Sequence, residues 1–229
     1  EPLVTGVAKL WLNTEPEADL LDEIWPAHAP AEVIGEGIPV PDHYDPAGFR
    51  ARHGLSDRPF VLYAGRREGA KNWDALLDGF VHAIRKEDLD LDLVTFGVGD
   101  VHVPPDVEGR VIDLGLLSDR DKDDAFAAAR AYLQPSAMES FSRTVMESWL
   151  AGTPVIANAA SAVVSWHCDR SGAGLTYEDA TELEQCLRFV AEAPTDAAAL
   201  AAPGRQYVLD HYTWPATLDR MEASLEAMP

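Results

Sequence analysis

The feature that most constrains the fold is a repeated alternation between short apolar runs and segments of helical period. Phe60–Ala64 is an apolar run of strand length, and from Trp73 to Ile84 apolar residues recur at the spacing of one helix face. Further apolar runs and helix-period segments alternate through most of the chain. Because strands that alternate with helices form parallel sheets, the pattern predicts an α/β fold, a doubly wound Rossmann-like parallel sheet.

The same pattern predicts where the other elements lie. Strands are expected at residues 91–96, 111–114, 132–134, 154–157 and 174–177. Helices are expected at residues 118–129, 143–151, 180–193, 197–209 and 215–227. Ser118 is a suitable N-cap for the first of these helices, and Gly152 a suitable C′ residue for the second.

The first forty residues differ from the rest of the chain. A helix is expected at residues 18–25, followed by a proline-rich stretch and a Gly35-Glu36-Gly37 turn. This segment is either the first βα unit of the same domain or the tail of a preceding domain with its linker, and we favour the second interpretation. The chain opens on Glu1 instead of Met, so we expect it to be processed or excised from a longer protein.

Charge and composition exclude several classes of protein. The formal net charge of -21 repels phosphate backbones, so nucleic acid is not an expected partner. No apolar stretch approaches the roughly 18–20 residues of a spanning helix. Cys168 and Cys186 are too few for a disulfide framework, and a reduced, cytoplasmic setting is the simplest expectation. His167 beside Cys168 lacks the ligand count of a zinc site, so no metal is expected.

The strongest motif is Glu139-Ser-Phe-Ser-Arg-Thr-Val-Met-Glu147, in which one carboxylate precedes an expected helix and the second lies inside it. Carboxylates accept hydrogen bonds from vicinal hydroxyls, and the free N–H groups at a helix start suit a phosphate. The spacing alone is not specific, because a glutamate at a helix N-terminus and another on its solvated face would also produce it.

A second motif, Gly65-Arg66-Arg67-Glu68-Gly69-Ala70-Lys71, follows the strand at Phe60–Ala64. It places three cations within six residues, although the chain has only four lysines and fourteen arginines against 39 acidic residues. Ligands of open α/β sheets bind at the carboxyl ends of strands, where this loop falls. Guanidinium and ammonium groups there suit a diphosphate, although a basic turn on an acidic surface would look the same.

With the Ser-Trp-Leu-Ala-Gly-Thr-Pro-Val-Ile-Ala157 stretch after Glu147, the two motifs resemble the signature of the family 4 (group 1) retaining glycosyltransferases of GT-B fold. The resemblance covers residues 33–227. It implies residues 1–40 as the end of the N-terminal domain and linker, residues 41–214 as the nucleotide-sugar-binding domain, and residues 215–229 as a helix packing back toward the N-terminal domain.

The resemblance also implies roles. Arg66 and Lys71 would hold the donor diphosphate, Glu139 the sugar hydroxyls and Glu147 the ribose, with Arg66, Lys71 and Glu139 catalytic. The other donor-binding residues expected from the family motifs are Ser140, Phe141, Ser142, Arg143, Gly97, Gly115 and Leu116. No cofactor or metal is needed in this family pattern, since the cations replace a divalent ion.

One departure concerns the donor. Where many members of the family carry a Gly-Gly segment, this chain has Asn158-Ala-Ala-Ser-Ala-Val163, which leaves the choice of sugar open. The nucleotide base and the acceptor, whether sugar, lipid or protein, are also open, as is peripheral membrane association through the missing domain. The fragment alone is expected to be inactive. The alternatives are a non-catalytic nucleotide-sugar-binding or scaffolding module, and another GT-B enzyme such as an epimerase or phosphorylase.

Overall fold

The computed structural model describes residues 2–228, and in it the expected strands form one six-stranded, fully parallel sheet. The strand order is β5-β4-β3-β6-β7-β8. These strands are β3 (Phe60–Ala64), β4 (Asp92–Phe96), β5 (Val111–Asp113), β6 (Ala131–Gln134), β7 (Val155–Asn158) and β8 (Leu175–Tyr177). The prediction of a doubly wound Rossmann-like sheet is confirmed.

The winding of the chain fixes where a ligand can bind. The chain enters the sheet at the central strand β3 and moves outward to β4 and β5. It then crosses back to β6, on the other side of β3, and moves outward again to β7 and β8. The loops that follow β3 and β6 therefore diverge at the switch point, where open α/β sheets leave a crevice.

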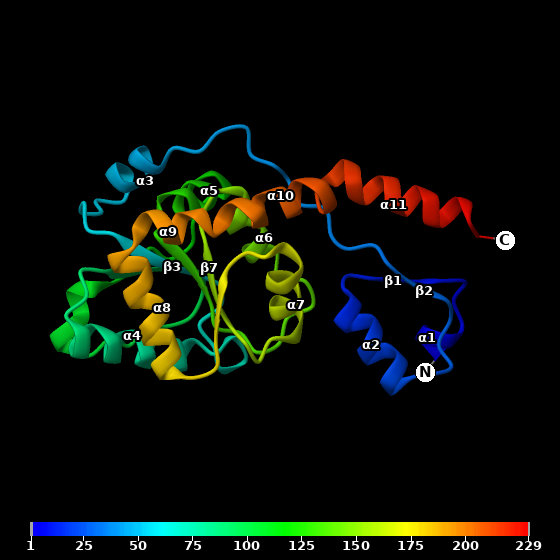
Figure 1. Ribbon diagram of the computed structural model, residues 1–229, viewed down its shortest axis with the longest axis horizontal. Coiled ribbons are helices and arrows are strands. Elements are labelled where there is room, and N and C mark those ends of the chain that lie inside the picture. Colours follow the sequence, from blue (N-terminus) through cyan, green and yellow to red (C-terminus); the bar gives the residue numbers. More distant parts are fainter. Residues whose placement is uncertain (1, 229) are drawn as a thin grey trace.

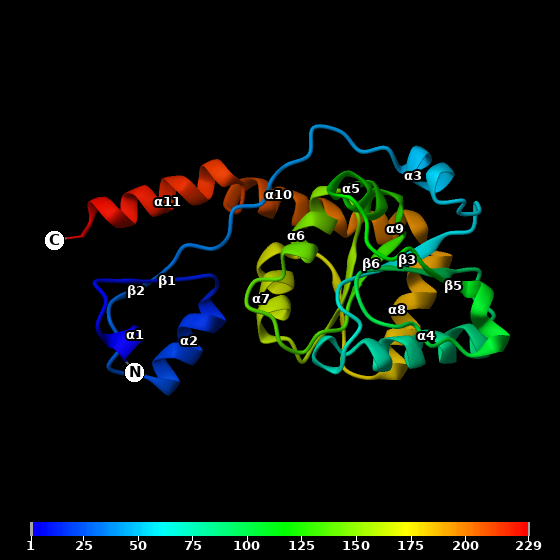
Figure 2. The same ribbon diagram turned by 180° about the vertical axis from the view of Figure 1, so that it is seen from behind.

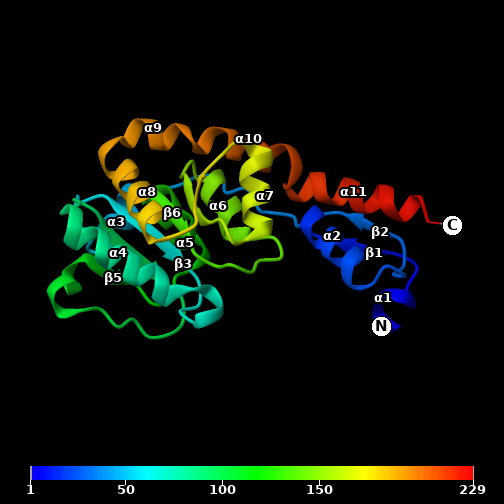
Figure 3. The same cartoon turned by 60° about the horizontal axis from the view of Figure 1, so that its bottom comes forward.

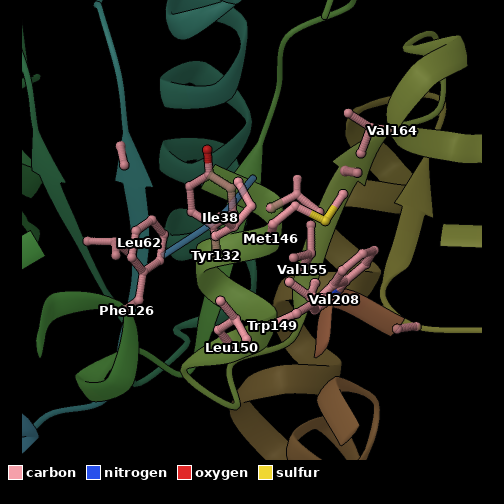
Figure 4. Packing of buried hydrophobic residues seen from close by; sticks show 14 of the residues in the cluster. Ile38, Leu62, Phe126, Tyr132, Met146, Trp149, Leu150, Val155, Val164 and Val208 are labelled. Carbon is pink, nitrogen blue, oxygen red and sulfur yellow. The ribbon is translucent and has the colours of Figure 1, made fainter. Parts of the chain in front are cut away.

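Helices cover both faces of this sheet (Figures 1 and 2). On one face, Leu62 of β3 packs with Phe126, Trp149 and Val208 from three helices, and Figure 4 shows this core. That layer contains α3 (Pro46–Arg52), α5 (Asp119–Ala128), α6 (Arg143–Leu150), α7 (Ala162–Ser171) and α10 (Ala201–His211). On the other face, the neighbouring Val61 packs against α4 (Trp73–Glu87), α8 (Ala180–Glu192) and α9 (Pro194–Ala199). The alternation of side chains along a strand thus serves two cores at once.

The N-terminal segment forms a separate small unit beside the last helix (Figures 1 and 3). It contains α1 (Pro2–Thr5), β1 (Leu10–Leu12), α2 (Glu15–Ile24) and β2 (Ala31–Val33), with the two strands parallel. Ser224 of α11 (Trp214–Glu226) accepts hydrogen bonds from Lys9 and from the Trp11 indole at 3.1 and 3.0 Å. It also donates to Glu32 at 2.5 Å, so one hydroxyl joins the helix to both strands.

Most expected boundaries are confirmed within one or two residues, including both predicted caps. The Ser118 hydroxyl accepts from the Asp121 amide, and Gly152 follows α6 in the left-handed conformation. None of the helices between residues 2 and 228 combines the length and apolar character that crossing a bilayer requires.

Several elements differ from the prediction, which did not include α1, β1 and β2 of the N-terminal segment. The single helix expected at residues 197–209 is wrong, because α9 ends at Ala199 and α10 starts at Ala201. Pro203 has no N–H to donate to the Ala199 carbonyl, so a continuous helix cannot pass this point. The pattern also missed α3 and α7, although each begins with a side-chain cap, from Asp45 and Ser161 respectively.

Gly204 makes possible the contact between α10 and α6, because a Cβ there would lie 2.5 Å from the ring of the buried Trp149. We expect Gly204→Ala to lower the free energy of unfolding by about 1–3 kcal/mol through overpacking. This loss would exceed the roughly 1 kcal/mol that alanine gains in helix propensity. Chemical denaturation measures the change. Gly109→Ala is the control, since its Cβ would meet nothing within 4 Å, and an equal effect of both substitutions would contradict the packing argument.

Candidate functional site

The switch point between β3 and β6 brings the two sequence motifs into contact. Lys71, on the loop after β3, donates a 2.6 Å hydrogen bond to the Glu139 carboxylate, on the loop after β6. Asn72, the next residue, donates to the Pro135 carbonyl of that second loop at 3.2 Å. The two loops are 68 residues apart in sequence yet form one wall, so the fold places a cation and a carboxylate at the same crevice.

A cleft of about 370 Å³ lies beside this ion pair. Six of the residues that the sequence proposed line it together: Arg66, Lys71, Glu139, Ser140, Ser142 and Arg143. The other lining residues belong to none of the predicted sites: Glu36, Tyr63, Ala64, Gly65, Gln134 and Thr144. Glu36 accepts from Arg143 at 3.3 Å, so the Gly35–Gly37 turn closes one side of the cleft.

Two adjacent arginines in the first motif have opposite environments. The Arg66 side chain is 63% exposed and reaches Glu68 at 3.3 Å, so its guanidinium is available at the cleft. The Arg67 side chain is 1% exposed and is bound by Asp113 and by the carbonyls of Gly97 and Gly99. Arg67 therefore ties the loop after β3 to the strands beside it, and Arg66 remains to meet a ligand.

The start of α6 has the geometry of an anion site. Ser142 precedes the helix in the left-handed conformation, with φ 67°, and its hydroxyl accepts from the Gln134 amide at 2.7 Å. Ser142 makes no side-chain cap, and Arg143 and Thr144, the first two residues of the helix, line the cleft. The first N–H groups of a helix have no acceptor one turn before them, which suits this end to an anion.

The side chain of Phe141 holds the loop between β6 and α6 against the core. Its ring is buried and packs edge-on against Tyr212 and His167, with ring centroids 5.0 and 5.3 Å apart. Burial lowers the pKa of His167 to about 3, which keeps this ring neutral, and its Nδ1 lies 3.0 Å from the Tyr207 hydroxyl. Phe141 can consequently meet a ligand only through its backbone.

Glu147 lies one turn into α6, outside the residues that line the cleft. Its carboxylate is nearly buried and accepts a 2.8 Å hydrogen bond from Lys122 of α5. Lys122 was not predicted, because it lies in an acidic helix without a recognisable motif. The only available signal was its rarity as one of four lysines.

Gly97, Gly115 and Leu116, which the family motifs also proposed, are not among the residues that line the cleft. The Gly97 amide donates to the Gly115 carbonyl at 2.7 Å, which joins the loops after β4 and β5. A Cβ on Gly97, whose φ is 135°, would lie 2.0 Å from the Gly65 carbonyl oxygen, so only glycine fits there. The Leu116 side chain is 77% exposed.

A second, larger cavity of about 550 Å³ adjoins the cleft and shares Lys71, Glu139 and Ser140 with it. It extends to α2 of the N-terminal unit and to the start of α7. Its wall includes Ala160, Ala162 and Val163, from the segment that replaces the family's Gly-Gly stretch. Among residues 2–228, no three His, Cys, Asp or Glu side chains gather as a metal site would require.

The family model for glycosyl transferases group 1 matches residues 58–192, which include both motifs and the switch point. The chain belongs to this family. It is similar to a GDP-mannose-dependent monoacylated alpha-(1-6)-phosphatidylinositol monomannoside mannosyltransferase of Corynebacterium glutamicum, at 23% identity over 88% of this chain and 56% of the relative. The chain thus spans about half the length of the curated relatives it matches.

Solved GT-B glycosyltransferases share the fold of this group 1 chain. A sucrose-phosphate synthase from Thermosynechococcus elongatus superimposes with a TM-score of 0.78 at 22% identity, over 95% of this chain and 57% of the synthase. The Anabaena protein HepE, solved with UDP-glucose, gives a TM-score of 0.80 at 16% identity, over 96% of this chain and 64% of HepE.

The different environments of Arg66 and Arg67 lead to a stability prediction. We expect Arg67→Met to lower the free energy of unfolding by about 2–4 kcal/mol, because it leaves buried carbonyls without a donor. Arg66→Met should change it by no more than about 0.5 kcal/mol, as at other exposed positions. Urea denaturation of both variants measures the difference, and equal losses would mean that Arg67 is not a structural tie.

Proposed function

We propose that the chain is the donor-binding half of a glycosyltransferase that takes a sugar from a nucleotide-diphosphate sugar and transfers it with retention of configuration. The observation that carries this proposal is the contact between Lys71 and Glu139 on one cleft, with Arg66 beside them. These are the groups that a sugar diphosphate needs: cations for its phosphates and a carboxylate for its hydroxyls.

The proposed chemistry depends on charge at the diphosphate. When the bond between the anomeric carbon and the diphosphate oxygen breaks, the electron pair stays with the departing diphosphate. Arg66, Lys71 and the free N–H groups of α6 then stabilise negative charge that grows in the transition state, so they accelerate transfer as well as bind. We expect no metal ion or other cofactor, because these fixed donors supply the positive charge.

In this proposal, donor binding has to change the contact between Lys71 and Glu139. Lys71 is paired with Glu139, and both are partly buried. When a phosphate takes the Lys71 ammonium, the Glu139 carboxylate becomes available to the hydroxyls of the attached sugar. In this proposal Glu147, one turn farther along α6, accepts from the ribose hydroxyls.

Similar proteins support the donor class without fixing the donor. The curated relative from Corynebacterium glutamicum is named for GDP-mannose, and HepE was solved with UDP-glucose. These differ in both base and sugar, so we propose a nucleotide-diphosphate hexose and leave its identity to a ligand panel. Because the cavity shared with α2 borders Glu139, we propose that it admits the acceptor.

The chain's partial coverage of its relatives bears on its boundaries. We propose that residues 1–40 end a preceding domain, that residues 41–214 bind the donor, and that residues 215–229 return to that domain. Two three-residue strands held to α11 by Ser224 support this division.

A transfer assay on this chain alone tests whether it is one half of an enzyme. We expect no transfer until the chain is joined to its partner domain, whereas transfer by the chain alone would show a self-sufficient enzyme. We also propose a cytoplasmic location, which the two free cysteines Cys168 and Cys186 would suit.

The proposed diphosphate contacts can be tested by calorimetry with a nucleoside diphosphate. Arg66→Ala and Lys71→Ala should each weaken binding by about 1–3 kcal/mol, the range for hydrogen bonds to charged groups. The matched control is Arg58→Ala, because Arg58 pairs with Asp90 and Asp92 at the opposite end of β3. Equal losses of binding free energy for the Arg58 and Arg66 variants would mean that the motif is only a basic turn.

Substitutions of the two glutamates should differ in their effect on binding when the ligand carries a sugar. Glu147→Ala should weaken nucleoside diphosphate and nucleotide sugar alike, by about 1–3 kcal/mol. Glu139→Ala should weaken only the sugar-bearing ligand and remove most transfer in the intact two-domain enzyme. Binding of both variants to both ligands measures this difference. If Glu139→Ala weakens binding of the bare nucleoside diphosphate as much as Glu147→Ala does, the roles of the two glutamates are wrongly assigned.

A further inference from the structure

Each glutamate of the Glu139–Glu147 motif is held by one of the chain's four lysines. Lys71 belongs to a motif that the proposed function uses, whereas Lys122 belongs to none. Lys122 sits in the first turn of α5, directly after the loop that carries Gly115 and Leu116. Its side chain reaches across to α6, where its ammonium lies 2.8 Å from Oε1 of Glu147.

Lys122 is the sole support of a carboxylate that would otherwise stand unpaired. Within residues 2–228, no other group donates a hydrogen bond or forms an ion pair with Glu147. The side chain of Glu147 is 9% exposed and that of Lys122 is 26% exposed, so solvent screens this pair only in part. Oε1 is occupied, which leaves Oε2 to accept from a ligand.

A second acidic group makes the cation more necessary. Burial raises the pKa of Asp123, Lys122 opposes that shift, and the negative charge of Glu147 adds to it. Asp123 and Glu147 therefore repel one another, and Lys122 is the cation that offsets both. Without this ammonium, the Glu147 side chain has no partner to keep it in one rotamer and a neighbouring carboxylate that repels it.

We infer that Lys122 is a positioning residue, which fixes the Glu147 carboxylate so that Oε2 meets the vicinal hydroxyls of the nucleotide's ribose. The inference rests on the proposed function and adds to it a residue outside both motifs. Lys122 acts through Glu147, so its contribution should be confined to ligands that carry those hydroxyls.

The test compares ligands with and without the ribose hydroxyls. Binding of UDP and GDP is measured by calorimetry beside their 2′,3′-dideoxy forms and inorganic pyrophosphate. For whichever base binds, the normal chain should prefer the ribose form about tenfold to a hundredfold, the range for hydrogen bonds to a charged group. Lys122→Met and Glu147→Ala should each reduce this preference to less than about threefold. Lys122→Met should leave the affinity for pyrophosphate unchanged.

Three further variants separate positioning from a general effect on folding. Lys122→Arg should keep the ribose preference, and Lys122→Gln, which lacks the charge, should lose most of it. Lys86→Met is the matched control, because Lys86 forms a 2.6 Å pair with Glu184 on the far side of the sheet. This substitution should leave the affinity for every ligand unchanged. If Lys122→Met does not fold, the contrast between arginine and glutamine decides the question.

The possible outcomes separate the positioning role of Lys122 from the proposed function. If Glu147→Ala loses the ribose preference and Lys122→Met keeps it, the positioning role is overturned and the proposed function stands. If Lys122→Met weakens pyrophosphate as much as it weakens the ribose form, Lys122 acts on the phosphates or the fold instead. If the normal chain binds no nucleoside diphosphate, the proposed function fails, and this inference fails with it.

Discussion

The pairing of β3 with β6 at the centre of the sheet is the constraint on which the site depends. Val61 and Leu62 of β3 pair with Ala131 and Tyr132 of β6, and the chain winds outward in opposite directions from these two strands. Because both strands are parallel, their following loops emerge at the same edge. One loop brings Arg66 and Lys71, and the other brings Glu139 and the start of α6.

Charge is distributed so that the few cations meet specific carboxylates. In a chain of net charge -21, two of the four lysines pair with the two glutamates of one motif. Arg67 neutralises Asp113 beneath the loop, and Arg66 keeps an exposed head group at the cleft. An anionic ligand would be repelled by most of this surface, so the place where it can bind is sharply limited.

Packing behind the cleft holds these groups in place. Phe141 and Ser142 join the loop after β6 to the core through an aromatic cluster and the Gln134 amide. Gly204 lets α10 approach Trp149 on the opposite side of α6. The helix whose first residues line the cleft is consequently held by packing at both its start and its end, which favours a site that is ordered before a ligand arrives.

The sequence by itself determined the parallel α/β fold, most element boundaries, and the loops that carry Arg66, Lys71 and Glu139, because these follow from local periodicity and short motifs. It did not show that the Arg67 side chain is buried, reveal Lys122, or show that Phe141 is buried, and it missed α3 and α7. The environments of Arg67 and Lys122 depend on partners distant in sequence: Asp113 for Arg67, 46 residues away, and Glu147 for Lys122, 25 residues away. Local patterns fix what a segment can form, whereas only the folded chain decides which charges and rings it meets.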